Sequence, residues 1–312
     1  MMDSRTPPNH LGFDMNIARI ILASIITVAG GIAFAAEPMK RTILITGAAT
    51  LIADETGKAL WTYPHASRDG WVLENGNVLL ALSKSKTYPS GAVVEVTKEG
   101  KIVFEFKGSQ SEVNTVQALS DGKILLTEAG DKPRILEVNR DGKITAEVAI
   151  RAQTKDHHLQ TRMSRKLPNG HYLVPQLSDR IVREYDSEGK IVWEAKTPNM
   201  PFTAIRTPDG HTLIGCTVGN LVIEVNAKGE EVWRVTNDDL PGKPISDACG
   251  VQRLDNGNTV FTSYRTTAGQ IKLVEVTREK KIVWTYTDDR KSGVHHFQIL
   301  DGEGKPSKNP MR

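Results

Sequence analysis

Short apolar runs, separated by glycine-containing turns, follow one another along the chain from residue 42 to residue 300. Within a run the apolar residues either alternate with polar ones or are continuous, as in strands of sheets that pack face to face. The segment 162–195, for example, predicts four successive strands at 162–167, 172–176, 181–185 and 191–195. This pattern predicts an all-β protein built from four-stranded units.

Asn-Gly or Asp-Gly pairs recur between these runs at intervals of 40 to 48 residues. Such pairs indicate tight hairpins in which both turn residues adopt positive φ. A period of about 40 to 50 residues with several strands in each unit is typical of a β-propeller. We therefore predict a six-bladed β-propeller of four-stranded blades. The pairs are Asn75-Gly76, Asp121-Gly122, Asn169-Gly170, Asp209-Gly210, Asn256-Gly257 and Asp301-Gly302.

A second repeat places an aromatic residue four positions after a turn residue. The turn residue is glycine in five units and Lys280 in the sixth. We interpret the aromatic rings as core residues that fill the gap between neighbouring blades, because large rings dominate the burial of apolar surface. The six slots are Trp61, Phe104, Ala146, Trp193, Trp233 and Trp284.

The two ends of the chain predict how the ring closes. Residues 42–63 supply three strands but no innermost strand, and residues 294–300 form a strand with nothing after it. Pairing them completes one blade and removes the last exposed sheet edges. We expect residues 303–312 to be flexible, and residues 305–312 to be dispensable because they hold two prolines and no apolar run.

The N-terminal segment has the pattern of an export signal. Arg19 precedes the apolar run 20–34, and Ala33 and Ala35 are the small residues that signal peptidase reads. We predict a signal peptide at residues 1–35, with Met15 as the natural start, and a single propeller domain at residues 36–312. The protein is then periplasmic or extracellular. An uncleaved signal anchor is the alternative.

Composition narrows the class of partner. The 40 basic and 37 acidic residues give a net charge of +3 and are spread evenly, which argues against nucleic acid. We expect a monomer. Cys216 and Cys249 fall in adjacent blades, so a disulfide and two buried free thiols are both compatible with the sequence.

Loops at the start of the innermost strands converge around the channel of a propeller, and polar residues gather there in this sequence. We take His158 and His296 as candidate bases or nucleophiles, because the pKa of histidine lies near working pH. No metal site is predicted from ligand spacing, although a divalent ion held by His158, His296 and Asp247 is an alternative. The candidate ligand-binding residues on this face are Arg68, Glu128, Gln176, Asp247, Cys249, Tyr264, Arg265 and His295.

The repeats also carry a family resemblance. Thr56 to Trp61, Glu188 to Trp193 and Lys228 to Trp233 resemble the tryptophan-docking repeats of the PQQ-like propeller superfamily. Leu167 to His171, Leu254 to Asn258 and Val294 to Gln298 are similar to strands of arylsulfotransferase-like six-bladed propellers. The resemblance implies the fold. It implies no PQQ cofactor, because the adjacent-cysteine pair of quinoprotein dehydrogenases is absent from the sequence. The resemblance to arylsulfotransferases implies that His296, together with His158, lies where those enzymes have the histidine that takes up the sulfuryl group.

Two functions follow. The first is an exported, non-catalytic propeller that binds a partner protein, a glycan or a small ligand at its channel face. The second is a small channel-site enzyme, a transferase, hydrolase or lyase, that uses His296 or His158.

Overall fold

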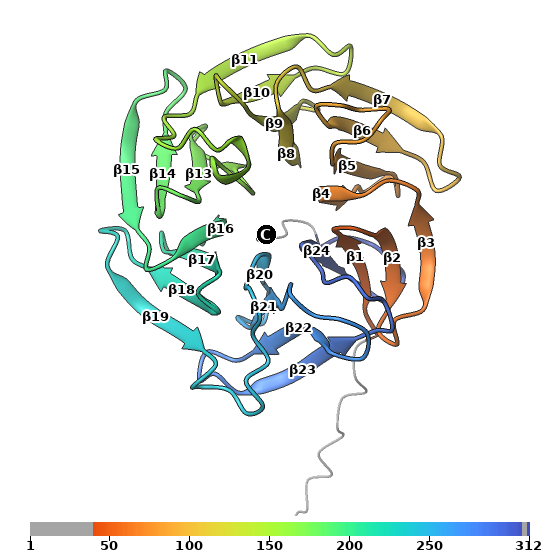
Figure 1. The fold of residues 1–312 in the computed structure, drawn as a ribbon, viewed down its shortest axis with the longest axis vertical. Coiled ribbons are helices and arrows are strands. Elements are labelled where there is room, and N and C mark those ends of the chain that lie inside the picture. Colours follow the sequence, from red (N-terminus) through yellow and green to blue (C-terminus); the bar gives the residue numbers. More distant parts are fainter. Residues whose placement is uncertain (1–39, 308–310) are drawn as a thin grey trace, which may run out of the picture. The chain divides into compact units, whose positions relative to one another are not determined.

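In the computed structural model, which describes residues 40–307 and 311–312, 24 strands form six four-stranded antiparallel sheets around a central axis (Figure 1). The predicted six-bladed β-propeller is therefore confirmed. The predicted signal peptide lies outside the described residues. Within them, no helix combines the length and apolar character needed to cross a lipid bilayer.

The four strands of each blade follow one another from the axis outward. The closing blade has β24 (His296–Leu300), β1 (Thr42–Thr46), β2 (Thr50–Asp54) and β3 (Ala59–Tyr63). Blade two has β4 (Ser67–Val72), β5 (Val78–Leu82), β6 (Ala92–Val96) and β7 (Ile102–Lys107). Blade three has β8 (Glu112–Ala118), β9 (Ile124–Ala129), β10 (Arg134–Val138) and β11 (Ile144–Ala149). Blade four has β12 (Arg165–Lys166), β13 (Tyr172–Gln176), β14 (Ile181–Tyr185) and β15 (Ile191–Lys196). Blade five has β16 (Met200–Arg206), β17 (Thr212–Thr217), β18 (Leu221–Val225) and β19 (Glu231–Thr236). Blade six has β20 (Val251–Arg253), β21 (Thr259–Thr262), β22 (Ile271–Val276) and β23 (Ile282–Thr287).

The ring closes as the sequence predicts. β24 pairs antiparallel with β1 from Thr42 opposite Leu300 to Thr46 opposite His296. The last described strand therefore completes the first blade. Because the inner edge of β1 would otherwise be open, the pairing covers that edge and joins the two ends of the propeller in one ladder.

The hairpin turns differ from the prediction in one respect. Gly76 has φ +82°, but Asn75 does not have positive φ. The Gly76 N–H donates to the Leu73 carbonyl, and the Asn75 side chain accepts from the Asn77 N–H at 3.0 Å. The asparagine thus stabilises the turn through its side-chain oxygen, and glycine alone takes the left-handed conformation.

The aromatic slots connect neighbouring blades. The indole N–H groups of Trp61, Trp193 and Trp233 donate to the carbonyls of Lys98, Ala227 and Arg278, each in the next blade, at 2.8–2.9 Å. These three rings are half-buried at the blade edge. The predicted packing between blades is therefore present, and each tryptophan adds a hydrogen bond to it.

Buried glutamates tie the same junctions together. The third strand of five blades carries a glutamate that forms an ion pair with a basic residue outside its own blade. Losing one partner would leave a buried charge unpaired, so these pairs make each junction sensitive to substitution. The pairs are Glu95–Arg140, Glu137–Lys166, Glu184–Arg206, Glu224–Arg253 and Glu275–Arg41.

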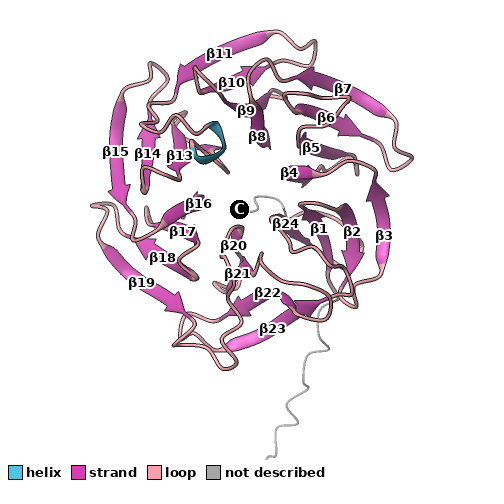
Figure 2. Ribbon diagram, in the orientation of Figure 1, coloured by secondary structure: helices cyan, strands magenta, loops and turns pink. Residues whose placement is uncertain are grey.

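Blade four begins later than predicted. Its inner strand was expected from residue 162, but the ladder of β12 starts at Arg165. Upstream of it, Thr115 of blade three accepts from the Ser164 N–H and donates to the Arg162 carbonyl, both at 3.0 Å. These bonds attach the segment to blade three, while the Arg162 N–H still donates to the Pro175 carbonyl of blade four at 3.4 Å. The 3-10 helix η1 (His157–Leu159) precedes this segment and is the one helix in the described part of the chain (Figure 2).

The C-terminal residues reach the centre of the ring (Figure 1). The Met311 carbonyl accepts a hydrogen bond from the Arg253 N–H at 2.9 Å, and Arg312 is 1% exposed. Residues 311 and 312 are therefore docked and not solvated, and the dispensability of residues 305–312 stays a prediction. No sequence signal marks this docking, because two prolines and scattered charges are typical of a solvated tail.

Candidate functional site: a cavity at the channel mouth

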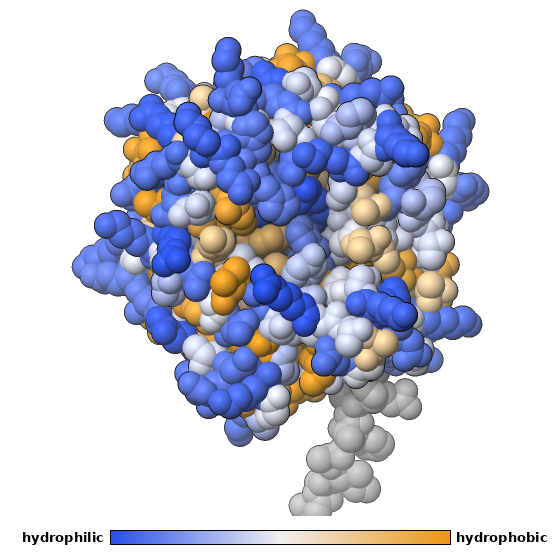
Figure 3. Space-filling model, in the orientation of Figure 1, coloured by the Kyte–Doolittle hydropathy of each residue, from blue (hydrophilic) through white to orange (hydrophobic). Residues whose placement is uncertain are grey.

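A cavity of about 470 Å³ opens on one face of the propeller, where the inner strands begin. η1 lies on the face turned toward the viewer in Figure 2, and His158 of η1 lines the cavity. Figure 3 shows that this face is hollowed near the axis. Apolar walls come from Leu159, Leu177, Met200, Phe202 and Val218.

β-Bulges deliver two of the lining side chains. The register of β4 shifts between Ser67 and Asp69, and that of β16 shifts between Pro201 and Thr203. The extra residues are Arg68 and Phe202, and both line the cavity. A bulge leaves its extra residue outside the ladder and re-aims its side chain, which explains why these two point into the channel mouth.

A buried carboxylate, Glu112, anchors one wall. Arg68 lies 3.1 Å from it and Lys84 lies 3.5 Å from it, while His158 Nδ1 lies 3.2 Å away. Burial alone would raise the pKa of Glu112, but the hydrogen bond from His158 and the charges of Arg68 and Arg162 lower this pKa to about 2. Glu112 is thus an anion that orients His158, and His158 itself remains largely exposed.

His295 lines the cavity between two aromatic rings. Its ring centroid lies 4.6 Å from that of Phe202 and 5.4 Å from that of Tyr264, both edge-on. His295 Nδ1 lies 3.2 Å from the Arg68 carbonyl. Because a carbonyl only accepts, Nδ1 carries the hydrogen, and Nε2 is an acceptor without a partner among the described residues. Burial, with the charges of Arg68 and Arg162, lowers the pKa of His295 to about 3, so the ring is neutral at physiological pH.

The rim between blades five and six holds strained backbone. Val218 has φ +65° and Asp247 has φ +62°, and both line the cavity. Val218 N–H donates to Asp247 Oδ1 at 2.7 Å, and Arg265 Nε lies 2.5 Å from Asp247 Oδ2. A β-branched residue rarely adopts positive φ. Val218 is nevertheless 52% exposed, so no core packing explains the strain. Strain of this kind gathers at ligand sites.

Arg162 forms part of the cavity floor and is 1% exposed. Its Nη1 donates to the Thr161 carbonyl at 2.7 Å, and its Nε has no hydrogen-bond partner among the described residues. Its guanidinium lies 5.8 Å from the centre of the Phe202 ring. Burial lowers the pKa of Arg162 to about 9, which still leaves it charged at neutral pH.

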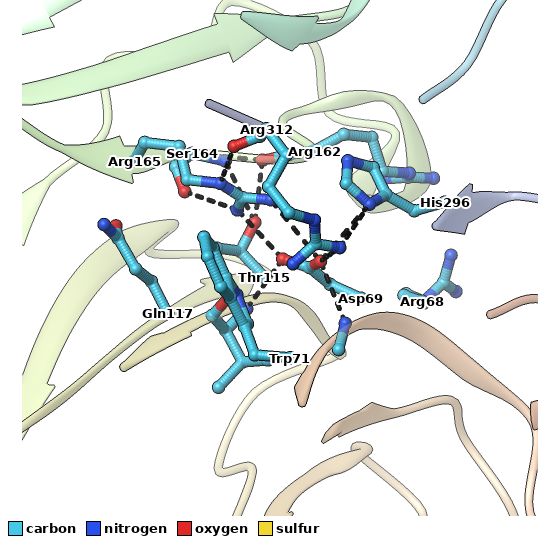
Figure 4. Close-up of polar contacts among 12 residues, drawn as sticks. Arg68, Asp69, Trp71, Thr115, Gln117, Arg162, Ser164, Arg165, His296 and Arg312 are labelled. Carbon is cyan, nitrogen blue, oxygen red and sulfur yellow. Dashed lines mark hydrogen bonds and ion pairs between the residues drawn. The ribbon is translucent and has the colours of Figure 1, made fainter. Parts of the chain in front are cut away.

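A second polar cluster lies nearer the axis (Figure 4). Asp69, fully buried, lies 2.9 Å from Arg165 and 3.4 Å from Arg312. Trp71 lies under both guanidiniums, with its ring centre 5.3 Å from Arg165 and 4.3 Å from Arg312. In Figure 4 Arg165 and Arg312 converge on Asp69. This cluster ties the inner strands to the C-terminal residues.

The cavity brings together most of the predicted site residues. Three predicted residues do not line it. His296 is fully buried beside Arg312, Glu128 is paired with Arg134, and Gln176 is bonded to the Tyr185 hydroxyl. The residues that do line it are Arg68, His158, Asp247, Cys249, Tyr264, Arg265 and His295.

Sequence reasoning missed Arg162, Phe202 and Glu112. Arg162 carried a readable signal, because a basic residue opened a run that was predicted to be a buried inner strand. Phe202 and Glu112 carried none. A phenylalanine in a strand is ordinary core, and a bulge leaves no mark in a single sequence.

Both cysteines are free thiols in the structure and both are buried. Cys249 Sγ lies 3.5 Å from the Thr217 hydroxyl. Burial raises the pKa of each thiol to about 12. Of the two arrangements left open by the sequence, the structure has the free thiols.

A candidate ligand set for a metal lies away from the cavity. Asp209, His211 and Glu224 are the group in the described residues whose ligand atoms converge within 4.8 Å. Glu224 already forms ion pairs with Arg253 and Arg278, which compete with a cation. The alternative trio of His158, His296 and Asp247 does not form such a group among the described residues.

Comparison with solved structures places the chain among β-propellers. A protein of unknown function from Bacteroides caccae has a TM-score of 0.74 at 22% identity, over 84% of this chain and 99% of that one. A catalytically inactive histidine-to-alanine variant of virginiamycin B lyase from Staphylococcus aureus, with quinupristin, has a TM-score of 0.56 at 14% identity, over 86% and 94%. The WD40 propeller domain of Doa1 has a TM-score of 0.52 at 14% identity, over 70% and 69%.

No protein-family model matches the sequence, and no curated protein matches it significantly. At these identities the structural likeness is one of fold. The family resemblance drawn from the repeats is therefore supported only as far as the β-propeller architecture.

Proposed function

We propose that this protein is an exported β-propeller that binds a small ligand in the cavity at the channel mouth. The observation that carries the proposal is the cavity itself. It has about 470 Å³ of space, apolar walls, and a few polar groups directed into it. Small-molecule sites in proteins have this size and this composition.

A small ligand suits the cavity better than a partner protein or a glycan. The exposed apolar residues at the cavity are Val218 and Tyr264, whereas the others of this kind lie on the outer strands. A protein interface needs about 800 Å² on each partner, with a central apolar core. A glycan has a largely hydroxyl surface and would leave the apolar side chains of Leu159, Leu177 and Phe202 poorly matched.

Catalysis is a second candidate, and His295 is the observation that favours it. The neutral ring presents Nε2 as a base, and one structural neighbour is a lyase described as inactive after loss of a histidine. With a pKa of about 3, however, His295 is a weak base at neutral pH. Binding is therefore the leading proposal. His295 and His158 are the candidate bases, because both line the cavity, whereas His296 is fully buried outside it.

The test is a thermal-shift screen of the full chain against small aromatic, sulfated, quinone, sugar and metal ligands. A ligand at 100 times its dissociation constant stabilises the folded protein by about 2.7 kcal/mol. The control is Ala48→Trp, because Ala48 is exposed and lines the cavity, so a bulky ring there should block entry without disturbing the core. Shifts that persist in Ala48→Trp would place binding elsewhere.

We also propose that the protein is exported and that it is related to known propeller families. The N-terminal pattern supports export, and the tryptophan-docking repeats support a relationship to the PQQ-like and arylsulfotransferase-like propellers. Mass spectrometry of the protein recovered from the cell envelope tests the first. A mature N-terminus at residue 36 is expected, and a full-length cytoplasmic product would oppose it.

A further inference from the structure

We propose that the ligand of this cavity is an organic anion, whose acidic group is bound by Arg162 and Arg68 and whose apolar body packs against Phe202. The inference rests on the proposed binding function and names the chemical class of the ligand.

The first argument is the balance of charge. Among the described residues, three guanidiniums and one carboxylate line the cavity. Asp247, the carboxylate, is already paired with Arg265. Glu112 stands behind the wall and is shared by Arg68, Lys84 and His158. The cavity therefore has an excess of positive charge.

The second argument is the state of Arg162. It forms no ion pair with any described residue, although it is 1% exposed. A buried charge without a partner costs several kcal/mol, and buried cations are normally paired. Its guanidinium has five N–H donors, of which one bonds the Thr161 carbonyl. An arriving anion would supply the missing partner.

The third argument is the position of Arg68. Its Nη2 lies 3.1 Å from Glu112, but its Nε has no partner among the described residues. Arg68 and Arg162 each lower the pKa of His295, so both project their charge toward the same space. In Figure 4 both side chains point away from Asp69, so the carboxylate of the axial cluster does not neutralise them.

The body of the ligand is defined by the apolar lining residues. Phe202, Met200 and Leu177 are apolar, and the Phe202 ring is packed edge-on by His295. Neutral His295 can accept a hydrogen bond at Nε2. The cavity thus suits a carboxylate or sulfonate attached to an aromatic or aliphatic body. Inorganic anions would leave the apolar wall unfilled.

The experiment uses two fluorescent probes of similar shape with the full-length protein. 8-Anilino-1-naphthalenesulfonate is an anion, and N-phenyl-1-naphthylamine is its neutral analogue. 1-Naphthoate, added as a competitor, tests a carboxylate in place of the sulfonate. We expect the anionic probe to bind roughly tenfold or more tightly than the neutral one, as the loss of a charged hydrogen bond predicts.

Substitutions of Arg162 test whether this residue binds the acidic group of the ligand. Arg162→Met should reduce the affinity for the anionic probe roughly tenfold and leave that for the neutral probe unchanged. Arg162→Lys keeps the charge and should retain most of the preference. Arg234→Met is the matched control, because Arg234 lies on the outer strand β19, is paired with Glu231 and does not line the cavity.

The outcomes are distinguishable. Equal binding of both probes, blocked by Ala48→Trp and insensitive to Arg162→Met, would overturn the anion assignment and keep the binding cavity. Probe binding that Ala48→Trp does not weaken, or no binding at all, would overturn both proposals. The comparison of the two probes on the wild-type protein remains decisive even if Arg162→Met fails to fold.

Discussion

Arg312 Nη2 donates a hydrogen bond to His296 Nδ1 at 2.8 Å, near the axis of the ring. Nδ1 therefore carries no hydrogen, and Nε2 does. Burial, with the charges of Arg312 and Arg165, holds the pKa of His296 well below its usual range. The histidine that the sequence suggested as a nucleophile thus acts as a neutral acceptor that holds the C-terminal residue in the channel.

The Asp69 cluster predicts a graded loss of stability. Arg312→Ala removes one of two guanidiniums from Asp69 and should lower the free energy of unfolding by about 1–3 kcal/mol. Asp69→Ala leaves Arg165 and Arg312 buried without a carboxylate and should cost about 3–5 kcal/mol. Urea denaturation measures both. Lys305→Ala, on an exposed side chain of the same tail, is the control. An Arg312→Ala protein as stable as the wild type would show that the contacts of Arg312 add nothing to stability, as a dispensable tail requires.

The fold was predictable because its determinants are local and repeated. A turn glycine recurs in five of the six units, and a ring follows four residues after the turn position in five of them. An ambiguous unit can therefore be assigned by comparison with the others. The closure was predictable for the same reason, since residues 42–63 lacked one strand of a known pattern.

The site was less predictable because its determinants are not repeated. Arg68 and Phe202 reach the cavity through bulges, which depend on the register between strands. His295 and His296 are neighbours along the chain, and alternation sends one ring to the cavity and the other to the axis. The sequence named both residues, but only the three-dimensional arrangement assigned them to different places.

Acid should destabilise the protein through His295. Its pKa is about 3 in the folded state and near 6.5 when unfolded, so the unfolded chain binds the proton more readily between these values. Stability from this group is complete above pH 6.5 and is lost as the pH falls toward 3. In that window His295→Asn should reduce the slope of unfolding free energy by up to about 1.4 kcal/mol per pH unit. Urea midpoints measured from pH 7 to pH 4 test this. An unchanged slope would contradict the lowered pKa of His295.

Protonation of Glu112 should cause a separate loss of folding stability at lower pH. Its folded-state pKa of about 2 lies below the ordinary value of 4.5, so its contribution is present above pH 4.5 and disappears as the pH falls toward 2. Glu112→Gln should make the unfolding free energy depend less on pH below pH 4.5. It should leave the pH dependence between pH 6.5 and pH 5 unaltered. If Glu112→Gln changed the upper region instead, the two windows would have been assigned to the wrong residues.

The thiols predict slow reactivity. Because Cys216 and Cys249 are buried with pKa values of about 12, few thiolate anions are available to attack a disulfide reagent. Folded protein should therefore react slowly with Ellman's reagent, and both thiols should react after denaturation in guanidinium chloride. Release of no thiol under denaturing, non-reducing conditions would instead reveal a disulfide. A Cys249 that reacts rapidly in the folded state would show that the cavity opens far enough to admit the reagent.

Lys280 occupies a position that glycine holds in the other five units, and it adopts a φ of +66° there. A left-handed conformation costs a non-glycine residue about 1–2 kcal/mol, whereas glycine adopts it freely and loses about 0.5–1 kcal/mol through greater freedom in the unfolded chain. Lys280→Gly should therefore stabilise the protein by about 0.5–1 kcal/mol. The surface pair with Asp239 that it removes is partly exposed and contributes little. Lys281→Gly, at the adjacent exposed position without positive φ, should lower stability by about 0.5–1 kcal/mol. Urea denaturation of both variants makes the comparison, and a loss of stability in each would mean that the Lys280 turn is not strained.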